Sequence, residues 1–366
     1  MKIISLFNNK GGVGKSTLAF HLSNILSEMG HKTLMIDLDP QCNLTIFGMN
    51  EEDLHEIWAA EDPYIDDFDS AVKSIPAEDF KKFLEKPRTI HFLLKPTEDG
   101  QGELENIPPP VHLRPNLDLI PGRLTIHKFE SKISERWSGA YLGEPLSIRT
   151  LTNIRNIAEI YAQKHNYKFV IIDTSPSLGA LNKVIISTVD GFLIPALPDM
   201  FSLYGIRNIG SSLMQWSKEF NTIYGLISEE KRKRFPEKFV RFLGYTIYNA
   251  KRYKGSNEWD LATAHANYAK QIPPTIELFI SPDVRSHLTT AQVNEPIGSS
   301  AVMHTHNTLP NMAQKYKCPI WLVPTCTGLD PDDKSTIMGN RDSYESTKKS
   351  YEKFAKSFLK RVSTLS

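Results

Sequence analysis

The feature that most constrains this chain is a glycine-rich turn between two segments of different periodicity. A short apolar run at residues 2–7 is typical of a buried strand, and apolar residues at helical spacing follow over residues 15–29. Glycines within residues 11–14 separate the two segments. A second buried strand is expected at residues 32–37, so the first forty residues predict a strand–helix–strand unit. Such a unit favours a parallel sheet with covering helices.

The same alternation returns in the second half of the chain. The expected fold class is therefore α/β, with a mostly parallel sheet covered by helices on both faces. The further strands are expected at residues 116–120, 169–173, 192–194 and 239–248, and the further helices at 148–165, 178–188, 257–272 and 302–317.

Two stretches depart from this rhythm. Residues of about 50–115 are rich in acidic side chains and end in a proline-stiffened return, so we expect an insertion at the edge of the sheet with helices of its own. Residues 331–366 are expected to form a tail whose residues 344–362 are a basic amphipathic helix. The remaining 1–330 would form the main domain.

Composition narrows the class of protein. The 366 residues are 40% hydrophobic, and 43 Lys and Arg nearly balance 42 Asp and Glu, which excludes a globally basic nucleic-acid coat. No apolar run is long enough for a membrane-spanning helix. The three cysteines lack CxxC spacing, and Cys42 is read as a small buried residue. With no secretory leader at its start, the chain is expected to be cytoplasmic.

Residues 9–17, Asn-Lys-Gly-Gly-Val-Gly-Lys-Ser-Thr, lie where a phosphate-binding P-loop must lie, between a strand and a helix. Glycines let backbone N–H groups converge on phosphate oxygens, and the helix start adds its positive dipole end. Lys15 would reach the β- and γ-phosphates, and the Ser16 hydroxyl would ligate Mg²⁺. The general motif has Gly where this chain has Asn9. The expected nucleotide-binding residues are Gly11, Gly12, Val13, Gly14, Lys15, Ser16 and Thr17.

The segment Lys-Gly-Gly-Val-Gly-Lys-Ser-Thr, which begins at Lys10, resembles the deviant Walker A motif of the ParA/MinD (Soj-like) family of P-loop ATPases. Four further segments, in the same order along the chain, also resemble that family and are closest to its ParA partition branch. They are residues 37–41 (the Walker A′ motif), 116–122, 169–179 (the Walker B strand and the following switch) and 194–206.

The resemblance implies that ATP and Mg²⁺ are bound. Lys10 would reach across a dimer interface to the partner's phosphates, and Asp39 would orient the attacking water. Asp37 and Asp173 would support Mg²⁺, and Asn249 would contact the adenine base. Taken singly, a strand-end Asp is also a common helix cap, and Asn also favours turns.

The resemblance further implies an ATP-dependent homodimer that hydrolyses slowly and is stimulated by a partner. The leading function is plasmid or chromosome partition, with non-specific DNA binding, nucleoid association and a centromere-binding ParB-like partner. Residues 279–285 depart from the family's basic run, because Asp283 replaces an arginine, although Arg285 remains. Basic clusters at 231–234, with Lys238 and Arg241, and at 251–254 are the alternative contacts for DNA.

Two other functions stay open. A MinD-like membrane-surface ATPase would use the helix at 344–362, although packing of that helix on the body is the favoured outcome. A nucleotide-sensing scaffold with negligible turnover would use the acidic insertion. His304 and His306 are read as surface or packing residues, and no helix-turn-helix is expected before the strand that begins at Lys2.

Overall fold

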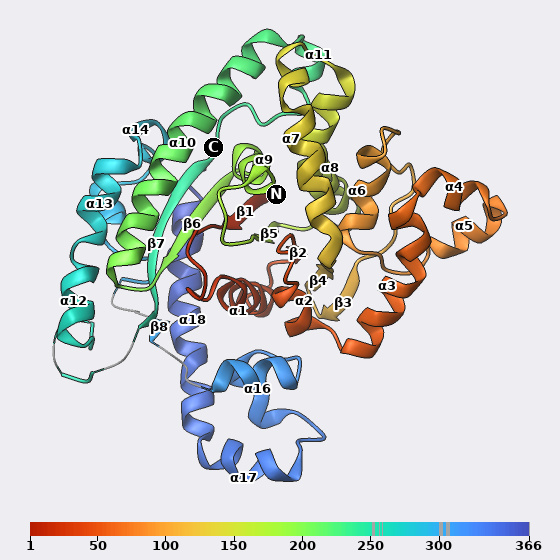
Figure 1. The fold of residues 1–366 in the computed structure, drawn as a ribbon. Helices are drawn as coiled ribbons and strands as arrows, with labels where there is room; N and C mark the ends of the chain where they lie inside the picture. The colour runs from red at the N-terminus through yellow and green to blue at the C-terminus, as the bar shows by residue number, and fades with distance from the viewer. Residues whose placement is uncertain (251–252, 256, 258, 300–302, 305–307, 366) are drawn as a thin grey trace.

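The computed structural model describes residues 1–250, 253–255, 257, 259–299, 303–304 and 308–365 (Figure 1). A sheet of eight strands in the order β3-β4-β2-β5-β1-β6-β7-β8 forms its centre, and among these strands only β3 runs antiparallel to its neighbour. The α/β prediction is thereby confirmed. The strands are β1 (Lys2–Leu6), β2 (Thr33–Asp37), β3 (Val111–Arg114), β4 (Leu117–Ile120), β5 (Phe169–Asp173), β6 (Gly191–Ala196), β7 (Arg241–Ala250) and β8 (Met303–His304).

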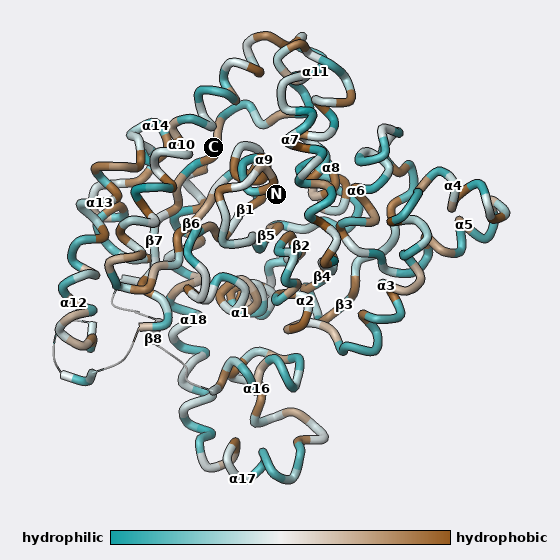
Figure 2. Tube along the Cα trace, viewed as in Figure 1, coloured by the Kyte–Doolittle hydropathy of each residue, from teal (hydrophilic) through white to brown (hydrophobic). Residues whose placement is uncertain are grey.

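Successive residues of the central strands enter two separate hydrophobic cores, as the two-residue period of a strand requires. Ile3 and Val170 face one core, whereas Ile4 and Ile171 face the other. In Figure 2 the strands at the centre of the sheet are mainly hydrophobic, whereas the outer helices contain both hydrophobic and hydrophilic residues along their length. Strands buried on both faces explain the continuous apolar runs in the sequence.

Helices cover both faces of the sheet (Figure 1). One face carries α1 (Lys15–Glu28), α2 (Asn43–Gly48), α16 (Leu309–Lys315), the 3₁₀ helix η2 (Ile320–Thr325), α17 (Pro331–Gly339) and α18 (Arg341–Val362). The helices on the other side are η1 (Leu124–Ile126), α7 (His127–Tyr141), α8 (Pro145–His165), α9 (Ala180–Thr188), α10 (Met200–Leu226), α11 (Glu229–Arg232), α12 (Thr263–Ala269), α13 (Ile272–Phe279), α14 (Pro282–Arg285) and α15 (Thr290–Asn294).

The acid-rich stretch forms helices at the sheet edge, as expected, and returns to the sheet as β3 (Figure 1). Aromatic rings hold these helices together: Tyr64 lies 4.5 Å from Phe83 and 5.6 Å from Phe92 between ring centroids. The helices are α3 (Glu51–Asp66), α4 (Phe68–Lys73), α5 (Ala77–Phe83) and α6 (Ile90–Glu98).

Helix α18 packs along α1 and η2 rather than extending into solvent (Figure 1). Its apolar side chains Tyr351, Phe354 and Phe358 are completely buried in the core beneath α1. The favoured packing of this helix is therefore confirmed. The division of the chain at residue 330 stays a prediction.

Two expected helices differ from the structure. The region 257–272 contains the shorter α12 and the start of α13, and the region 302–317 begins with β8 before α16. Met303 pairs with Tyr248, so tertiary pairing overrides the helical periodicity there. Within the described residues, no helix is long and apolar enough to cross a membrane. Lys251, Arg252 and His306 lie outside the described residues.

Candidate functional site

The loop between β1 and α1 needs glycine at two positions. Gly12 has φ 73° and Gly14 has φ 79°, a left-handed conformation that glycine adopts at little cost. A Cβ atom at Gly14 would lie 2.2 Å from Cε1 of Tyr248, whereas one at Gly12 would meet nothing within 4 Å. Gly14 also precedes the first turn of α1, so its conformation sets the direction in which the N–H groups of that turn point.

Asn8 and Lys15 organise the inside of this loop. The side chain of Asn8 donates to the Pro195 carbonyl (2.7 Å) and accepts from the Lys10 N–H (2.9 Å), while Lys15 Nζ donates to the Asn8 carbonyl at 3.1 Å. Burial lowers the pKa of Lys15, and the Asp173 and Asp39 carboxylates counteract this effect. The lysine is therefore held at the centre of the loop beside two acids.

Asp37 and Asp173 end neighbouring strands directly opposite one another in the register of β2 and β5. Asp37 accepts from the Thr45 N–H (2.8 Å), the Thr45 hydroxyl (2.7 Å) and the Asp39 N–H (3.1 Å). Burial raises its pKa to about 6 despite these hydrogen bonds. Its carboxylate is thus tied to the start of α2, which it orients.

Asp173 is different, because both of its carboxylate oxygens are buried and receive no well-aligned hydrogen bond from the described residues, although the Ser16 hydroxyl is close enough to lower its pKa. Burial and the adjacent Asp37 raise its pKa to about 8, and Ser16 and Lys15 act in the opposite direction. A buried carboxylate with no well-aligned hydrogen bond beside a P-loop serine fits a Mg²⁺ site, since Mg²⁺ commonly takes one or two protein ligands together with substrate phosphates. The described residues contain no ready-made cluster of three or more metal-binding side chains.

Two further predicted residues, Asp39 and Asn249, occupy the same end of the sheet. Asp39 is buried, and its Oδ1 accepts from the Gln41 N–H at 2.9 Å. Asn249, near the end of β7, is exposed and has φ 59°, a conformation that Asn tolerates better than most residues. Its predicted contact with adenine stays a prediction.

Lys10 is engaged within its own chain. Its ammonium forms an ion pair with Asp199, whose carboxylate also accepts from the Ser202 N–H (2.8 Å) and so caps α10. The same ammonium lies 5.7 Å from the centroid of the Phe201 ring. Lys10 is therefore held against the first turn of α10, beside the P-loop.

Apolar side chains are exposed around Lys10. Phe201 and Tyr204 on α10 are 66% and 56% exposed, and Leu178 in the switch segment is 36% exposed. Gly205 of α10 lies against Asn9, and Pro176 lies near Gly11, so these segments adjoin the P-loop. The result is an apolar face, defined here as Leu178, Met200, Phe201 and Tyr204, beside the nucleotide site.

Hydrogen bonds connect the acidic insertion to the same site. The Thr45 hydroxyl, which donates to Asp37, accepts from the Gly122 N–H at 2.8 Å, and the Gly122 carbonyl accepts from Trp58 Nε1 of α3 at 3.1 Å. The next residue, Arg123, pairs with the buried Glu61 of α3 (3.3 Å). A continuous polar path therefore leads from Asp37 into the insertion.

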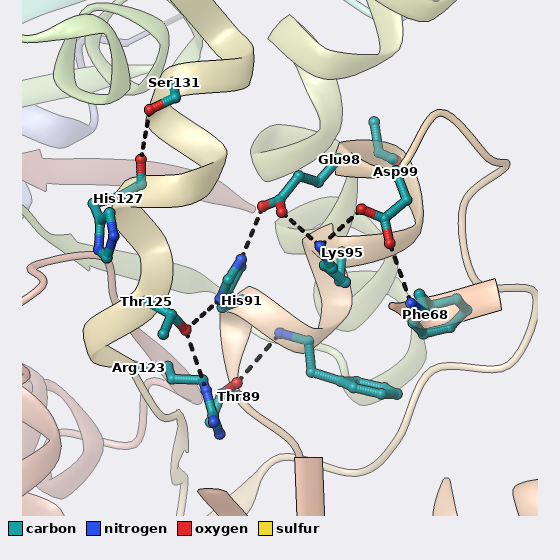
Figure 3. A network of polar contacts seen from close by, with 12 residues as sticks. Phe68, Thr89, His91, Lys95, Glu98, Asp99, Arg123, Thr125, His127 and Ser131 are labelled. Atoms are coloured by element: carbon teal, nitrogen blue, oxygen red, sulfur yellow. Dashed lines mark hydrogen bonds and ion pairs between the residues drawn. The ribbon is translucent and has the colours of Figure 1, made fainter. Parts of the chain in front are cut away.

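That path continues into a buried network under α6 (Figure 3). Arg123 donates to Thr125, whose hydroxyl contacts His91 Nδ1 at 2.7 Å, and His91 Nε2 contacts Glu98 at 2.9 Å. Lys95 joins Glu98 (2.8 Å) to Asp99. Burial lowers the pKa of His91, which favours its neutral form. These bonds fix the insertion to the body of the protein.

The motifs in the sequence did not reveal several residues that shape the site. Asn8, Thr45 and Tyr248 act through contacts between segments distant in sequence, so no local pattern identifies them. Asp199 had a signal, because an Asp just before a helical run is typical of a helix cap. That signal did not indicate its ion pair with Lys10.

The AAA domain family (AAA_31) matches residues 1–224, more than half of the chain. Together with its relatives, this match shows that the chain belongs to this family and is a ParA/MinD-type P-loop ATPase by descent.

Three relatives illustrate the likeness. An uncharacterized protein of Methanocaldococcus jannaschii is 33% identical over 57% of this chain and 63% of its own length. The sporulation initiation inhibitor protein Soj of Bacillus subtilis is 26% identical over 60% of this chain and 68% of its own length. The chromosome partitioning protein ParA of Caulobacter vibrioides is 24% identical over 57% of this chain and 61% of its own length. The match thus covers less than two thirds of the first and third relatives.

Solved structures share the fold. The protein DIP2308 from Corynebacterium diphtheriae has a TM-score of 0.62 at 24% identity, covering 79% of this chain and 90% of that one. The pNOB8 ParA bound to nonspecific DNA has a TM-score of 0.56 at 18% identity, covering 99% of this chain and 98% of that one. An ATP complex of a Cyanothece McdA variant has a TM-score of 0.52 at 17% identity, covering 100% of this chain and 96% of that one.

Proposed function

We propose that this chain is an ATP-dependent dimerising switch ATPase of DNA partition. The observation that carries the proposal is the buried Asp173 carboxylate, whose nearby protein groups include Ser16 and Lys15 of the P-loop. Lys15 would bind the β- and γ-phosphates, and the N–H groups of residues 11–17 would bind the remaining oxygens. The relative named chromosome partitioning protein ParA supports a role in partition.

Ser16 and Asp173 would hold Mg²⁺, and Asp37 would support the site from its position on the neighbouring strand. When bound, the metal would neutralise phosphate charge. Asp39, which is fixed by the Gln41 N–H, would orient the attacking water. Asn249 would contact the base. Hydrolysis would remove the γ-phosphate contacts and so reset the switch.

Dimerisation would cover the apolar face around Lys10. In a face-to-face dimer, Lys10 would exchange Asp199 for the partner's phosphates, and Phe201 and Tyr204 would be buried. An ammonium delivered in trans would stabilise charge on the phosphates much as an arginine finger does. A monomer would keep Lys10 paired with Asp199, which favours slow turnover before dimerisation.

Non-specific DNA binding and a centromere-binding partner that stimulates hydrolysis remain part of the proposal. The basic cluster at 231–234 supplies less free charge than its sequence indicates. Lys233 pairs with Glu230 at 2.6 Å, and Arg234 pairs with Glu103. Lys231 and Arg232 keep their charge, although each donates to a backbone carbonyl. DNA binding would therefore depend on these two residues and on cations elsewhere. Such a protein would be cytoplasmic and associated with the nucleoid.

The decisive experiment measures ATPase activity with and without duplex DNA, and DNA binding in ATP and in ADP across a salt series. We expect ATP-dependent binding that weakens steeply with salt. Lys15→Ala should abolish ATP binding, and Asp39→Ala should slow hydrolysis and trap an ATP-bound dimer. ATP-dependent dimerisation without DNA binding would contradict the partition role, and unchanged turnover in Lys15→Ala would contradict the nucleotide site.

A further inference from the structure

A cavity of about 400 Å³ opens at the end of the sheet opposite the P-loop. Lys2 at the start of β1 and Arg241 at the start of β7 line it, together with Lys238 and His287. The P-loop follows the other end of β1, and the five residues of that strand, at about 3.3 Å each, separate the two places by about 16 Å. The cavity is therefore distinct from the nucleotide site.

The charges that line this cavity do not cancel. Arg155 and Asp190 also line it, but they pair with each other at 3.0 Å, and Asp190 accepts from the Ile3 N–H as well. The charges of Arg155 and Asp190 therefore neutralise one another and do not contribute to the net charge of the cavity.

Three cations remain. Lys2 and Lys238 form no ion pair with any carboxylate among the described residues, and the Arg241 guanidinium donates there only to the Asp283 carbonyl. Glu237 is the one lining carboxylate, among the described residues, that is not already paired with a cation. The cavity therefore has an excess of positive charge, which attracts anions.

His287 also lines the cavity but adds no charge to it. Both ring nitrogens are shielded from solvent and have no hydrogen-bond partner in the described part of the chain. Burial and the adjacent Arg241 lower its pKa to about 4, so the ring is neutral near pH 7. A neutral imidazole offers one donor and one acceptor, and buried groups of this kind are normally paired.

We propose that this cavity binds a small polyanion with two or more phosphate or carboxylate groups, held by Lys2, Lys238 and Arg241. Its volume lies within the range of small-molecule sites, roughly 300–1,000 Å³. The cations line a concave surface, which suits a compact ligand better than a convex duplex. The inference does not depend on the partition role.

Titration calorimetry at low salt, with inorganic tripolyphosphate and citrate as probes, tests the proposal. The protein carries Lys15→Ala, so that the P-loop does not bind phosphate. We expect one site per chain, and Lys238→Glu in this background should weaken binding at least tenfold. Lys349→Glu, an exposed residue of α18 outside the cavity, is the matched control and should change affinity less than twofold.

The two probes distinguish phosphate from carboxylate ligands. Lys2→Glu is a second variant, in case Lys238→Glu unfolds, which circular dichroism would reveal. Equal weakening by Lys238→Glu and Lys349→Glu would mean non-specific attraction and overturn the proposal. If neither tripolyphosphate nor citrate binds, the proposal is overturned. Binding of duplex DNA through Lys238 in that case would assign these cations to DNA instead.

Discussion

At the scale of single residues, the site depends on charged side chains that are buried, although such side chains ordinarily remain in contact with water. Asp173 is a buried acid with no well-aligned hydrogen bond from the described residues, and Lys15 is a lysine with little access to water. Burying either charge alone costs free energy. Together, beside a P-loop, the two groups form a site in which a charged ligand would supply the missing interactions. The nucleotide site is thus prepared before its ligand arrives.

Gly14→Ala should destabilise the protein more than Gly12→Ala. Both substitutions force a side chain into a left-handed conformation at about 1–3 kcal/mol. Only Gly14 would also push a Cβ into the ring of Tyr248, whose hydroxyl is fixed by Tyr351 at 2.9 Å. We expect an additional loss of about 1–3 kcal/mol, measured by urea unfolding. Equal losses in the two variants would contradict the close approach of Tyr248.

At the scale of elements, the insertion and α18 are both joined to the P-loop region through buried contacts. Trp58 of α3 reaches Gly122 and, through Thr45, Asp37. Phe354 and Phe358 of α18 lie in the core beneath α1. Elements contributed by distant parts of the sequence therefore hold the loop and the helix that would bind phosphate.

The insertion should make stability depend on pH through Glu61. Burial raises its pKa to about 7, above an ordinary value of about 4.3, so the folded chain keeps this proton over a range where the unfolded chain releases it. Stability should therefore fall as pH rises from about 4 to about 7. Urea unfolding across this range should give a flatter profile for Glu61→Gln, whereas the exposed Glu52→Gln should keep the wild-type slope. A wild-type slope in Glu61→Gln would contradict this assignment.

Removing one ring from α18 should test its docking. Phe358→Ala should cost about 3–5 kcal/mol, because the ring is completely buried and its loss leaves a cavity. Lys356→Ala, on the exposed side of the same helix, should change stability by less than about 0.5 kcal/mol. Denaturant unfolding measures both. A negligible effect of Phe358→Ala would mean that α18 is undocked in solution, and it would revive the membrane-surface alternative.

At the scale of the whole molecule, the nucleotide end of the sheet has an apolar face that one chain leaves uncovered. Phe201 is exposed there beside Lys10, and Tyr204 on the same helix and Leu178 in the switch segment are exposed as well. Exposed apolar patches next to a charged site are typical of surfaces that another molecule covers. A second copy of this chain is the occupant that the proposed function requires.

Phe201→Ser should weaken the ATP-dependent dimer by about tenfold or more, since a large ring near the centre of an interface contributes strongly to affinity. Met214→Ser is the matched control, because Met214 is 67% exposed on the same helix about 20 Å further along. Sedimentation velocity in ATP measures both. Equal dimerisation of the Phe201→Ser variant and the wild type would place the interface elsewhere.

Much of this architecture could be predicted from local patterns. The buried strands and the Gly14-Lys15-Ser16 turn have short-range signals, and they identify the fold and the centre of the site. The Lys10–Asp199 and Arg234–Glu103 pairs could not be predicted, because the folded chain brings together partners that are distant in sequence. The strand at Met303 was missed for the same reason.

The order of the strands also has a consequence for synthesis of the chain. β1 pairs with β5 and β6, and α1 is covered by α18, so β1 and α1 leave the ribosome before the elements that cover them. At about 5–20 residues per second, the roughly 170 residues between β1 and β5 take about 8–30 s to translate. Until then the apolar faces of β1 and α1 are uncovered, which makes the nascent chain a natural client of chaperones. Competence to bind nucleotide would then arise late, when α18 closes over α1.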